Sequence, residues 1–423
     1  MIAKTILKKY TSVSLMLRIF IGLVIGAILG LTLPSLTGIG ILGRIFVSAL
    51  KGIAPVLVAV LVISSIAKAG RGLGRRFSSL IAIYLLSTFI AAVCAVVGSF
   101  LFPVTLELGP AAEGVQVGEG AGSLGDVFTN LLTGMVGNPV AAVANANYIA
   151  ILFWSIILGI ALKTMASKAT VQVVHDLSDV VSRVVKWVIQ FAPFGILGLV
   201  FTTVSENGLS VFTTYGHLLL LLVGCMLANA LIFNPLISFI MLRKNPYPLL
   251  FTCLKESGLQ AFFTRSSAAN IPINMALCKK MGLDENFYSV SIPLGATINM
   301  DGAAVTITVF SLAVANTLGV DVSFASALFL GVIATLGACG ASGVAGGSLL
   351  LIPMACSFFG IGNDVAMGAV AIGFIIGVVQ DSVETALNSS GDAFFTATAE
   401  YYDRNRMQQH TTADTHPANP PRD

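Results

Sequence analysis

The sequence predicts an all-α polytopic membrane protein with eight transmembrane helices, two re-entrant helical hairpins and inverted repeats. Of the 423 residues, 56% are hydrophobic and 10% are charged, and the mean hydropathy is +0.91. Many apolar segments reach the ~20 residues that cross a bilayer. In addition, small polar residues interrupt two apolar segments of the C-terminal half. The net charge of +3 is small and gathers at the ends of apolar segments, so nucleic-acid binding is not expected.

Six membrane spans are expected in the first part of the chain. They cover about 14–34, 41–68, 77–105, 124–165, 175–206 and 212–242. The fourth is overlong and contains Gly134, Gly137 and Pro139, which predicts several helical pieces. The first follows three lysines, like a signal peptide, but it is too long and lacks a small-residue cleavage site. We therefore expect it to remain as a span.

Basic residues indicate the orientation of the spans, because they are retained on the cytoplasmic side. They recur at every second boundary: Lys4 to Arg18, Lys68 to Arg76, Lys163 and Lys168, Arg243 and Lys244, Lys279 and Lys280, and Arg404 and Arg406. The acidic loop at 106–123 has no basic residue and is expected outside. Both termini are therefore predicted to be cytoplasmic. The polar tail at 403–423 is expected to be disordered.

From Pro246 onward the pattern changes. Small polar residues interrupt apolar sequence at 265–272 and at 337–347, so each half is too short to cross the bilayer. Each segment should enter and return on one side, covered by protein or lining a cavity. A long span with a polar break follows each hairpin, at 299–302 and at 381–392. With opposite entry sides, this predicts an inverted repeat and a midplane binding site. Packing through glycine would explain the glycines but not the acids.

Buried acids without basic neighbours are the main indication of function. No Lys or Arg lies between Lys280 and Arg404, yet four acids stand in apolar sequence there: Asp301, Asp381, Glu384 and Asp392. A carboxylate in hydrocarbon costs ~2.5–3.5 kcal/mol on insertion scales, so it persists only with a partner. Bound cations, protons or the amino group of a substrate could supply the missing positive charge.

The last span carries a polar face. Its members are spaced by three, one, three and four residues, and so share one side of a helix: Asp381, Glu384, Thr385, Asn388 and Asp392. Hard cations such as sodium prefer oxygen ligands of this kind. The alternative is a seam that only holds helices together. Arg265 could pair with one of these acids.

The preceding span carries Asn299 and Asp301, which would point in opposite directions on a regular helix. Gly295 and Gly302 flank them and allow local unwinding. Either both side chains turn inward, or they serve separate sites. In the second case Asp301 faces third-span hydroxyls, namely Tyr84, Ser87 and Thr88. Tyr84 by itself could also be an ordinary interfacial aromatic residue.

The hairpin tips offer groups for a substrate. Ser266 and Ser267, near helix N-termini, could hold a carboxylate. The second tip has five glycines in the eleven residues of 337–347, which allows close backbone approach and a flexible lid. The six cysteines stand singly in apolar sequence and are expected to be core residues rather than ligands or disulfides.

The motif Asn299-Met300-Asp301-Gly302, with the two hairpins, resembles the dicarboxylate/amino acid:cation symporter family, which includes the glutamate transporters. The resemblance covers nearly the whole chain and is strongest over 261–392. The stretches at 263–270 and 384–390 are similar to the sodium/serine-threonine symporter branch. The family forms homotrimers in which a mobile transport domain carries substrate past a rigid scaffold by an elevator motion.

The resemblance implies a division into domains. Residues 1–76 hold the first two spans of the scaffold, and 77–123 hold the third span, which belongs to the transport domain, and the outer loop. Residues 124–245 hold spans four to six, which are scaffold with part of the transport domain. Residues 246–402 form the transport core with both hairpins and the seventh and eighth spans, and 403–423 form the cytoplasmic tail.

The resemblance also implies site residues. One sodium site matches Gly295, Asn299, Asn388 and Asp392, and another matches Tyr84, Ser87, Thr88, Asn299 and Asp301. A third matches the backbone of Thr297–Met300 with the glycine hairpin. Asp381 matches the acid that binds the substrate amino group. The contacts to the amino-acid main chain match Thr385, Asn388, Ser267 and the hairpin backbones at Ser266, Gly340, Ser342 and Gly343.

Three positions depart from the family pattern. Glu384 stands where dicarboxylate carriers have an arginine for the substrate side chain, and Ala303 stands where they have a threonine. Ser342 replaces the proline at the tip of the second hairpin. Glu384 would repel aspartate or glutamate, since unpaired like charges discriminate strongly. A substrate hydroxyl could instead donate to Glu384, which favours serine and threonine.

These features together predict a sodium-coupled importer of serine and threonine in a bacterial cytoplasmic membrane. Sodium is the expected coupling ion, and neither another cofactor nor an enzymatic activity is expected. Alternatives are proton coupling, other small neutral amino acids or dicarboxylates as substrate, and a passive channel. An intramembrane aspartyl protease would need a G-x-G-D motif, which Ser390-Gly391-Asp392 matches poorly.

Overall fold

The computed structural model describes residues 13–68, 75–108, 135–339, 341 and 346–414. Helices make up nearly all of these ranges, and no strand occurs within them. The described cysteines are free thiols, as expected. Five helices of the described chain are long and apolar enough to cross a membrane, or six if one bent pair forms a single span. The protein is therefore a multi-pass helical membrane protein.

The first three helices lie close to the predicted spans. They are α2 (Leu15–Thr32), α3 (Gly40–Lys68) and α4 (Arg75–Leu101). Glycine lets α2 pack tightly on a later helix: a Cβ on Gly22 would lie 2.2 Å from the Pro193 carbonyl oxygen, and one on Gly26 would lie 2.5 Å from that of Leu197. These two glycines therefore allow α2 to approach the helix at Ala192–Asn207 closely.

The fourth predicted span is broken as expected in its described part. It contains α6 (Pro139–Ala144) and α7 (Tyr148–Met165), while 124–134 lie outside the described residues. The fifth differs from the expected single span at 175–206. It is α8 (Lys168–Gln190) and α9 (Ala192–Asn207), bent by 52° where Pro193 begins the second helix and cannot donate a backbone hydrogen bond to the first.

The sixth span contains an irregular turn. It consists of α10 (Val211–Ala228), the π-helical turn η4 (Asn229–Phe233) and α11 (Asn234–Leu242). The Asn234 N–H donates to the Asn229 carbonyl, which is the five-residue hydrogen bond of a π-helix.

Two helical hairpins follow. The first runs through α12 (Tyr247–Cys253), the π-helical turn η5 (Leu254–Gly258) and α13 (Leu259–Thr264), then returns as α14 (Ser267–Lys280). It reverses where predicted, at Arg265 with φ of +51° and Ser266, whose side chain caps α14. The second runs through α17 (Phe324–Ala338) and returns as η6 (Ser348–Leu351) and α18 (Ile352–Ser357).

The long spans after the hairpins differ from each other. The first is α15 (Glu285–Ile298) and α16 (Asp301–Thr317), with the predicted break at Asn299 and Met300. The second is one helix, α19 (Asn363–Asp414), so the predicted break at 381–392 is wrong. Its polar side chains do not compete with the helix, since Ser382 and Thr385 donate to carbonyl oxygens one turn earlier. The helix also continues past 403, into the expected disordered tail.

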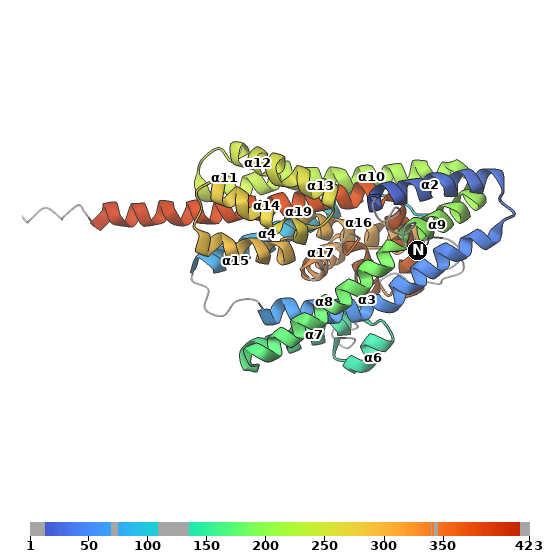
Figure 1. Cartoon of the computed structure of the whole chain (residues 1–423), viewed down its shortest axis with the longest axis horizontal. Coiled ribbons are helices and arrows are strands. Elements are labelled where there is room, and N and C mark those ends of the chain that lie inside the picture. The colour runs from blue at the N-terminus through green and yellow to red at the C-terminus, as the bar shows by residue number, and fades with distance from the viewer. Residues whose placement is uncertain (1–12, 69–74, 109–134, 340, 342–345, 415–423) are drawn as a thin grey trace, which may run out of the picture.

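The helices form two groups (Figure 1). Helices α2, α3, α7, α8 and α9 pack on one another, with α3, α7 and α8 side by side along one edge. Helices α4, α10 to α15, α17 and α18 surround α16 and α19, and α16 is buried from Asp301 to Ala315. The division of the chain into a scaffold and a transport core remains a prediction.

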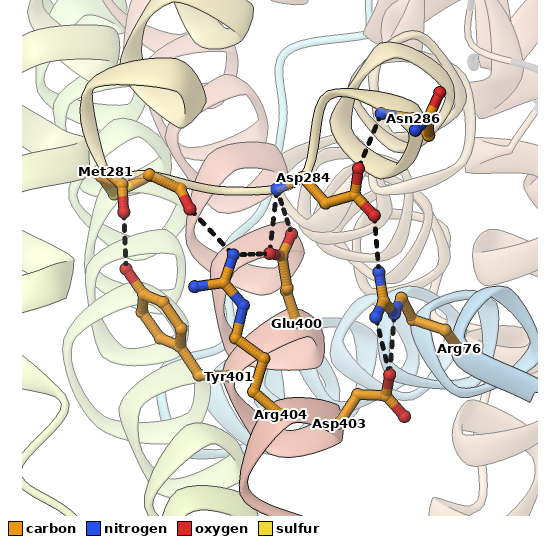
Figure 2. A network of polar contacts seen from close by, with 9 residues as sticks. Arg76, Met281, Asp284, Asn286, Glu400, Tyr401, Asp403 and Arg404 are labelled. Carbon is orange, nitrogen blue, oxygen red and sulfur yellow. Dashed lines mark hydrogen bonds and ion pairs between the residues drawn. The ribbon is translucent and has the colours of Figure 1, made fainter. Parts of the chain in front are cut away.

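A polar network ties three helices of the second group together (Figure 2). Arg76 on α4 donates to Asp403 at 2.9 Å and to Asp284, the cap of α15, at 3.2 Å. The Asp284 backbone N–H donates to both oxygens of Glu400 at 2.9 and 3.0 Å, and Arg404 pairs with the same carboxylate. The network fixes the ends of α4, α15 and α19 against each other.

Candidate functional site

Asp301 lies in a cage of neutral donors. It begins α16 and is buried. Four side chains donate to it: Ser87 Oγ at 2.6 Å, Thr88 Oγ1 at 3.1 Å, Asn229 Nδ2 at 2.8 Å and Asn234 Nδ2 at 2.8 Å. Hydrogen bonds to an ionised group stabilise it. Asp301 is thus held as a carboxylate site without a basic partner among the described residues.

Sequence reasoning missed Asn229 and Asn234. They are five residues apart, so on an α-helix they would point in different directions. The π-helical turn brings positions five apart into register, and both amides then reach Asp301. Two asparagines inside an otherwise apolar span were the available signal.

A second site surrounds Asp392, which is 1% exposed. Asn299 Nδ2 donates to its Oδ1 at 3.0 Å. Its Oδ2, and Oδ1 of Asn299, are buried and have no hydrogen-bond partner within the described chain. A Cβ on Gly295 would lie 2.8 Å from Asp392 Oδ1 and from the Tyr84 hydroxyl, so glycine is needed there. These two buried oxygens, one of the Asp392 carboxyl group and one of the Asn299 amide, are ligands that a cation could use.

Asn299 and Asp301 therefore serve separate clusters, the second of the two arrangements considered above. Tyr84 lies apart from Ser87 and Thr88, with which it was predicted to share a sodium site. Its hydroxyl lies 3.1 Å from Thr396 Oγ1 and 3.3 Å from the Asp392 carbonyl, whereas Ser87 and Thr88 face Asp301. Since Tyr84 is 0% exposed, the interfacial interpretation of this residue is wrong.

Asn388 of α19 contacts the residues at the break between α15 and α16. Its Oδ1 accepts from the Gly302 N–H at 2.8 Å, and its Nδ2 lies 3.4 Å from Met300 Sδ. Its backbone carbonyl accepts from Asn299 Nδ2 at 3.3 Å. The unwound backbone is thus held against α19.

Glu384 forms a third cluster at the second hairpin. It is buried, and its Oε2 accepts three hydrogen bonds: Thr306 at 2.7 Å, Ser348 at 2.8 Å and Gln380 at 2.6 Å. Ala303, also buried, lies one turn before Thr306 on α16. Sequence reasoning missed Thr306, Ser348 and Gln380, because single polar residues in apolar helices carry no strong pattern.

Asp381 has a basic partner, which the other three acids lack among the described residues. Arg265 Nε donates to its Oδ2 at 2.6 Å, and the Gly346 N–H donates to its Oδ1 at 3.2 Å. The pairing of Arg265 with an acid of the last span, raised above, is confirmed. Both hairpins thus meet α19 at one carboxylate.

The other predicted residues contact the backbone of their own helices, are buried, or lie outside the described chain. Thr385 donates to the Asp381 carbonyl and Thr297 to that of Leu294, both at 2.7 Å. Ser266 caps α14, and Ser267 is buried at its first turn. Three residues of the second hairpin are outside the described ranges: Gly340, Ser342 and Gly343.

Another polar cluster links α14 to α19 and was not predicted. Asn270 Nδ2 donates to Ser389 Oγ at 2.7 Å and to Ser257 Oγ at 2.9 Å. Asn274 Nδ2 donates to the Ser389 carbonyl at 2.9 Å. These bonds hold the first hairpin to the last helix.

The helix groups meet around a cavity of about 530 Å³ away from these acids. It lies between α3, α9 and the start of α19. There Lys51 of α3 pairs with Asp364 of α19. This ion pair bridges the two groups.

Comparison with known proteins identifies the family. A model described as the sodium:dicarboxylate symporter family matches residues 15–401. The chain belongs to this family. The resemblance seen in the hairpins and in the motif at 299–302 is confirmed, and a family of symporters indicates a transporter rather than an enzyme.

Proteins similar in sequence to this chain come from several bacteria. A protein named serine/threonine transporter SstT from Bifidobacterium adolescentis is 58% identical over 393 residues, covering 93% of this chain and 91% of the relative. Proteins of the same name from Streptococcus thermophilus and Streptococcus agalactiae are each 54% identical, covering 94% of this chain and 98% of each relative.

Proposed function

We propose that this protein is a sodium-coupled symporter that imports serine and threonine across a bacterial cytoplasmic membrane by elevator-type alternating access. The observation that carries the proposal is the environment of Asp392. Its Oδ2 and the Asn299 Oδ1 are buried oxygens without donors in the described chain. An uncompensated carboxylate in a low-dielectric interior requires a positive charge, and oxygen ligands suit sodium.

The sodium sites follow the matched residues. Gly295, Asn299, Asn388 and Asp392 hold one ion, and the cluster of Asp301 with Ser87 and Thr88 holds another. Tyr84 remains in the proposed second set, although its hydroxyl lies on the Asp392 side. The backbone of Thr297–Met300 and the second hairpin form the third. At Asp301 the amides of Asn229 and Asn234 now donate to the carboxylate. Rotation of these amides would present their oxygens to an arriving cation.

The substrate site lies between the hairpins and α19. Asp381 takes the substrate ammonium, which must displace Arg265 from its present ion pair. The main-chain contacts come from Thr385, Asn388, Ser266, Ser267, Gly340, Ser342 and Gly343.

Selectivity resides at Glu384 and Ala303. Glu384 Oε2 already accepts three hydrogen bonds, so a serine or threonine hydroxyl would replace or add to neutral donors there. A dicarboxylate would bring a like charge into the same buried pocket, which excludes it. The names of the relatives support this substrate class.

Sodium coupling provides sufficient free energy for concentration. The substrate is a zwitterion, so sodium carries the net charge. At ~100 mV one charge gains ~2.3 kcal/mol, and a tenfold sodium gradient adds ~1.4 kcal/mol. The sum of ~3.7 kcal/mol supports roughly 500-fold accumulation per sodium ion.

The elevator proposal rests on the two helix groups. The core, with α4, α15 and α19 tied by Arg76 and Glu400, moves as one body against α2, α3 and α7 to α9. The full arrangement has eight spans, two re-entrant hairpins, both termini in the cytoplasm and three copies in a homotrimer.

The decisive experiment uses proteoliposomes and labelled serine. Replacing external sodium with choline at fixed pH should abolish concentrative uptake. Uptake that persists in choline but collapses when a pH gradient is removed would establish proton coupling instead. A sustained sodium current without substrate would establish a channel.

A further inference from the structure

A groove runs between α4 and α10 on the outside of the core. Its inner part encloses about 370 Å³ and is lined by apolar side chains and two cysteines, including Ile90, Val97, Cys94, Leu221, Cys225 and Phe233. Within the described chain, no charged side chain lines it. Its floor is close-packed: a Cβ on Gly98 of α4 would lie 2.5 Å from Cys225 Sγ of α10.

The groove has a polar end. An adjoining cavity of about 650 Å³ shares Leu101, Phe102 and Leu221 with the inner part, and adds Thr105, Thr214 and His217. These polar residues stand where α4 ends and α10 begins, which is the edge of a membrane span. The groove is thus apolar along the helices and polar at their ends.

The dimensions suit one leaflet of a bilayer. From His217 to Ala228 α10 rises about 16 Å, close to the ~15 Å depth of half a hydrocarbon core. The groove therefore matches a molecule with a long apolar chain and a polar end. Because the described lining carries no charged side chain, it would select the apolar part of such a molecule rather than an anionic or cationic headgroup.

The far end of the groove reaches the π-helical turn η4. Ala228 and Phe233, both in its lining, flank and end the π-helical turn η4. The same turn places Asn229 and Asn234 against Asp301. An occupant of the groove therefore packs against the backbone that positions two of the four donors to this carboxylate.

We propose that the groove holds one acyl chain of a membrane glycerophospholipid, with the ester region at Thr105, Thr214 and His217, and that the chain stabilises the π-helical turn. Binding of the lipid does not depend on the proposed sodium coupling. The effect on the Asp301 cluster does depend on it.

Two glycines of α10 provide a matched pair of variants. A Cβ on Gly224, in the groove, or on Gly216, outside its lining, would meet nothing within 4 Å. Gly224→Leu therefore fills the groove without a clash, and Gly216→Leu is the control with the same change on the same helix. Equal or raised melting temperatures would verify that both fold.

Photo-crosslinking tests the binding. The full chain is placed in nanodiscs with phosphatidylcholine that carries a diazirine on one acyl chain, and the adducts are mapped by peptide sequencing. We expect adducts to concentrate in 90–102 and 220–233. Each buried methylene contributes about fourfold in affinity, so exclusion of two or more should lower labelling in Gly224→Leu about tenfold or more. Gly216→Leu should label like the original chain.

Three results would overturn the binding proposal. Labelling spread over all lipid-facing helices in proportion to exposure would mean ordinary annular lipid. Unchanged labelling in Gly224→Leu would place the chain elsewhere. Displacement of the probe by a free fatty acid as readily as by phosphatidylcholine would make a fatty acid the occupant.

Sodium-dependent thermal stabilisation tests the coupling. Gly224→Leu should change the sodium concentration that gives half of the stabilisation by at least severalfold, and Gly216→Leu should not. Equal values for the two variants would overturn the link to the Asp301 cluster. If sodium stabilises none of the proteins, the proposed function fails, while the crosslinking map still decides the lipid site.

Discussion

Arg265 donates to Asp381 across 2.6 Å, and this buried contact joins the tip of the first hairpin to the last helix. Arg265 follows α13 in the left-handed conformation, with φ of +51°, which ends that helix at the tip. The guanidinium thus pairs with the carboxylate that is proposed to bind the substrate ammonium.

Arg265→Ala should tighten serine binding and lower the stability of the protein. Removing one member of a buried charge pair costs about 3–5 kcal/mol of stability, and the substrate no longer has to displace the guanidinium. We expect about tenfold tighter binding by titration calorimetry and a lower melting temperature. Lys280→Ala, which removes an exposed ion pair with Glu256, is the control and should change neither. Weaker serine binding in Arg265→Ala would instead make the guanidinium part of the substrate site.

Asp392→Asn should abolish sodium-dependent uptake. The amide keeps the size of the side chain but removes the charge that neutralises the ion. The sodium concentration for half-maximal binding should rise about tenfold or more, equivalent to ~1.4 kcal/mol, in a sodium titration of labelled-serine uptake. Asp321→Asn, at an exposed loop acid, is the control. Normal uptake with unchanged sodium affinity would refute the role of Asp392.

Asn234→Ala should destabilise the Asp301 cluster. A hydrogen bond to a charged group contributes about 1.5–3 kcal/mol, and Ser87 loses its bond to Asn234 Oδ1 as well. We expect a lower melting temperature and altered sodium affinity, measured by sodium-dependent thermal unfolding. Asn286→Ala removes an exposed amide and should leave both unchanged. Two indistinguishable variants would mean that the amide is not needed to hold the carboxylate.

Glu384→Gln should relax substrate selectivity. It removes the buried negative charge that repels dicarboxylates while retaining the length of the side chain. Labelled-serine uptake should fall, and competition by aspartate should strengthen about tenfold or more, or ~1.4 kcal/mol. Glu285→Gln, an exposed acid at the start of α15, serves as the control. Aspartate that still fails to compete would assign selectivity to another residue.

Crosslinks between the two helix groups should stop transport, whereas crosslinks within one group should not. In a chain without native cysteines, Lys51→Cys with Asp364→Cys joins α3 to α19, and a bifunctional thiol reagent should arrest transport. Arg76→Cys with Asp403→Cys joins two helices of one group, and crosslinking there should leave transport running. Transport that continues after the first crosslink would contradict an elevator motion of these groups.

The break at Asn299 and Met300 could be predicted from local sequence. Glycines beside polar residues in an apolar span predict unwinding, and the structure has it. The same argument failed at 381–392. There the polar side chains are satisfied by the preceding turn of α19 and by neighbouring helices, so the backbone stays helical.

The full set of hydrogen-bond donors around Asp301 could not be predicted from local sequence. Asp301 could be recognised as a buried acid, but two of its donors depend on the π-helical register of Asn229 and Asn234. That register depends on how α10 packs against α4 and α16, which no local pattern encodes.

The sequence by itself determined the membrane-spanning class, the tip of the first hairpin and the acids that are buried in the membrane-spanning part. These follow from hydropathy and from the cost of charge in hydrocarbon, which are properties of each segment. Only the tertiary structure decided which acid already has a partner. Arg265 reaches Asp381 across 116 positions of the chain, whereas Oδ2 of Asp392 has no hydrogen-bond donor within the described chain. Long-range packing, rather than composition, assigns each charge its partner.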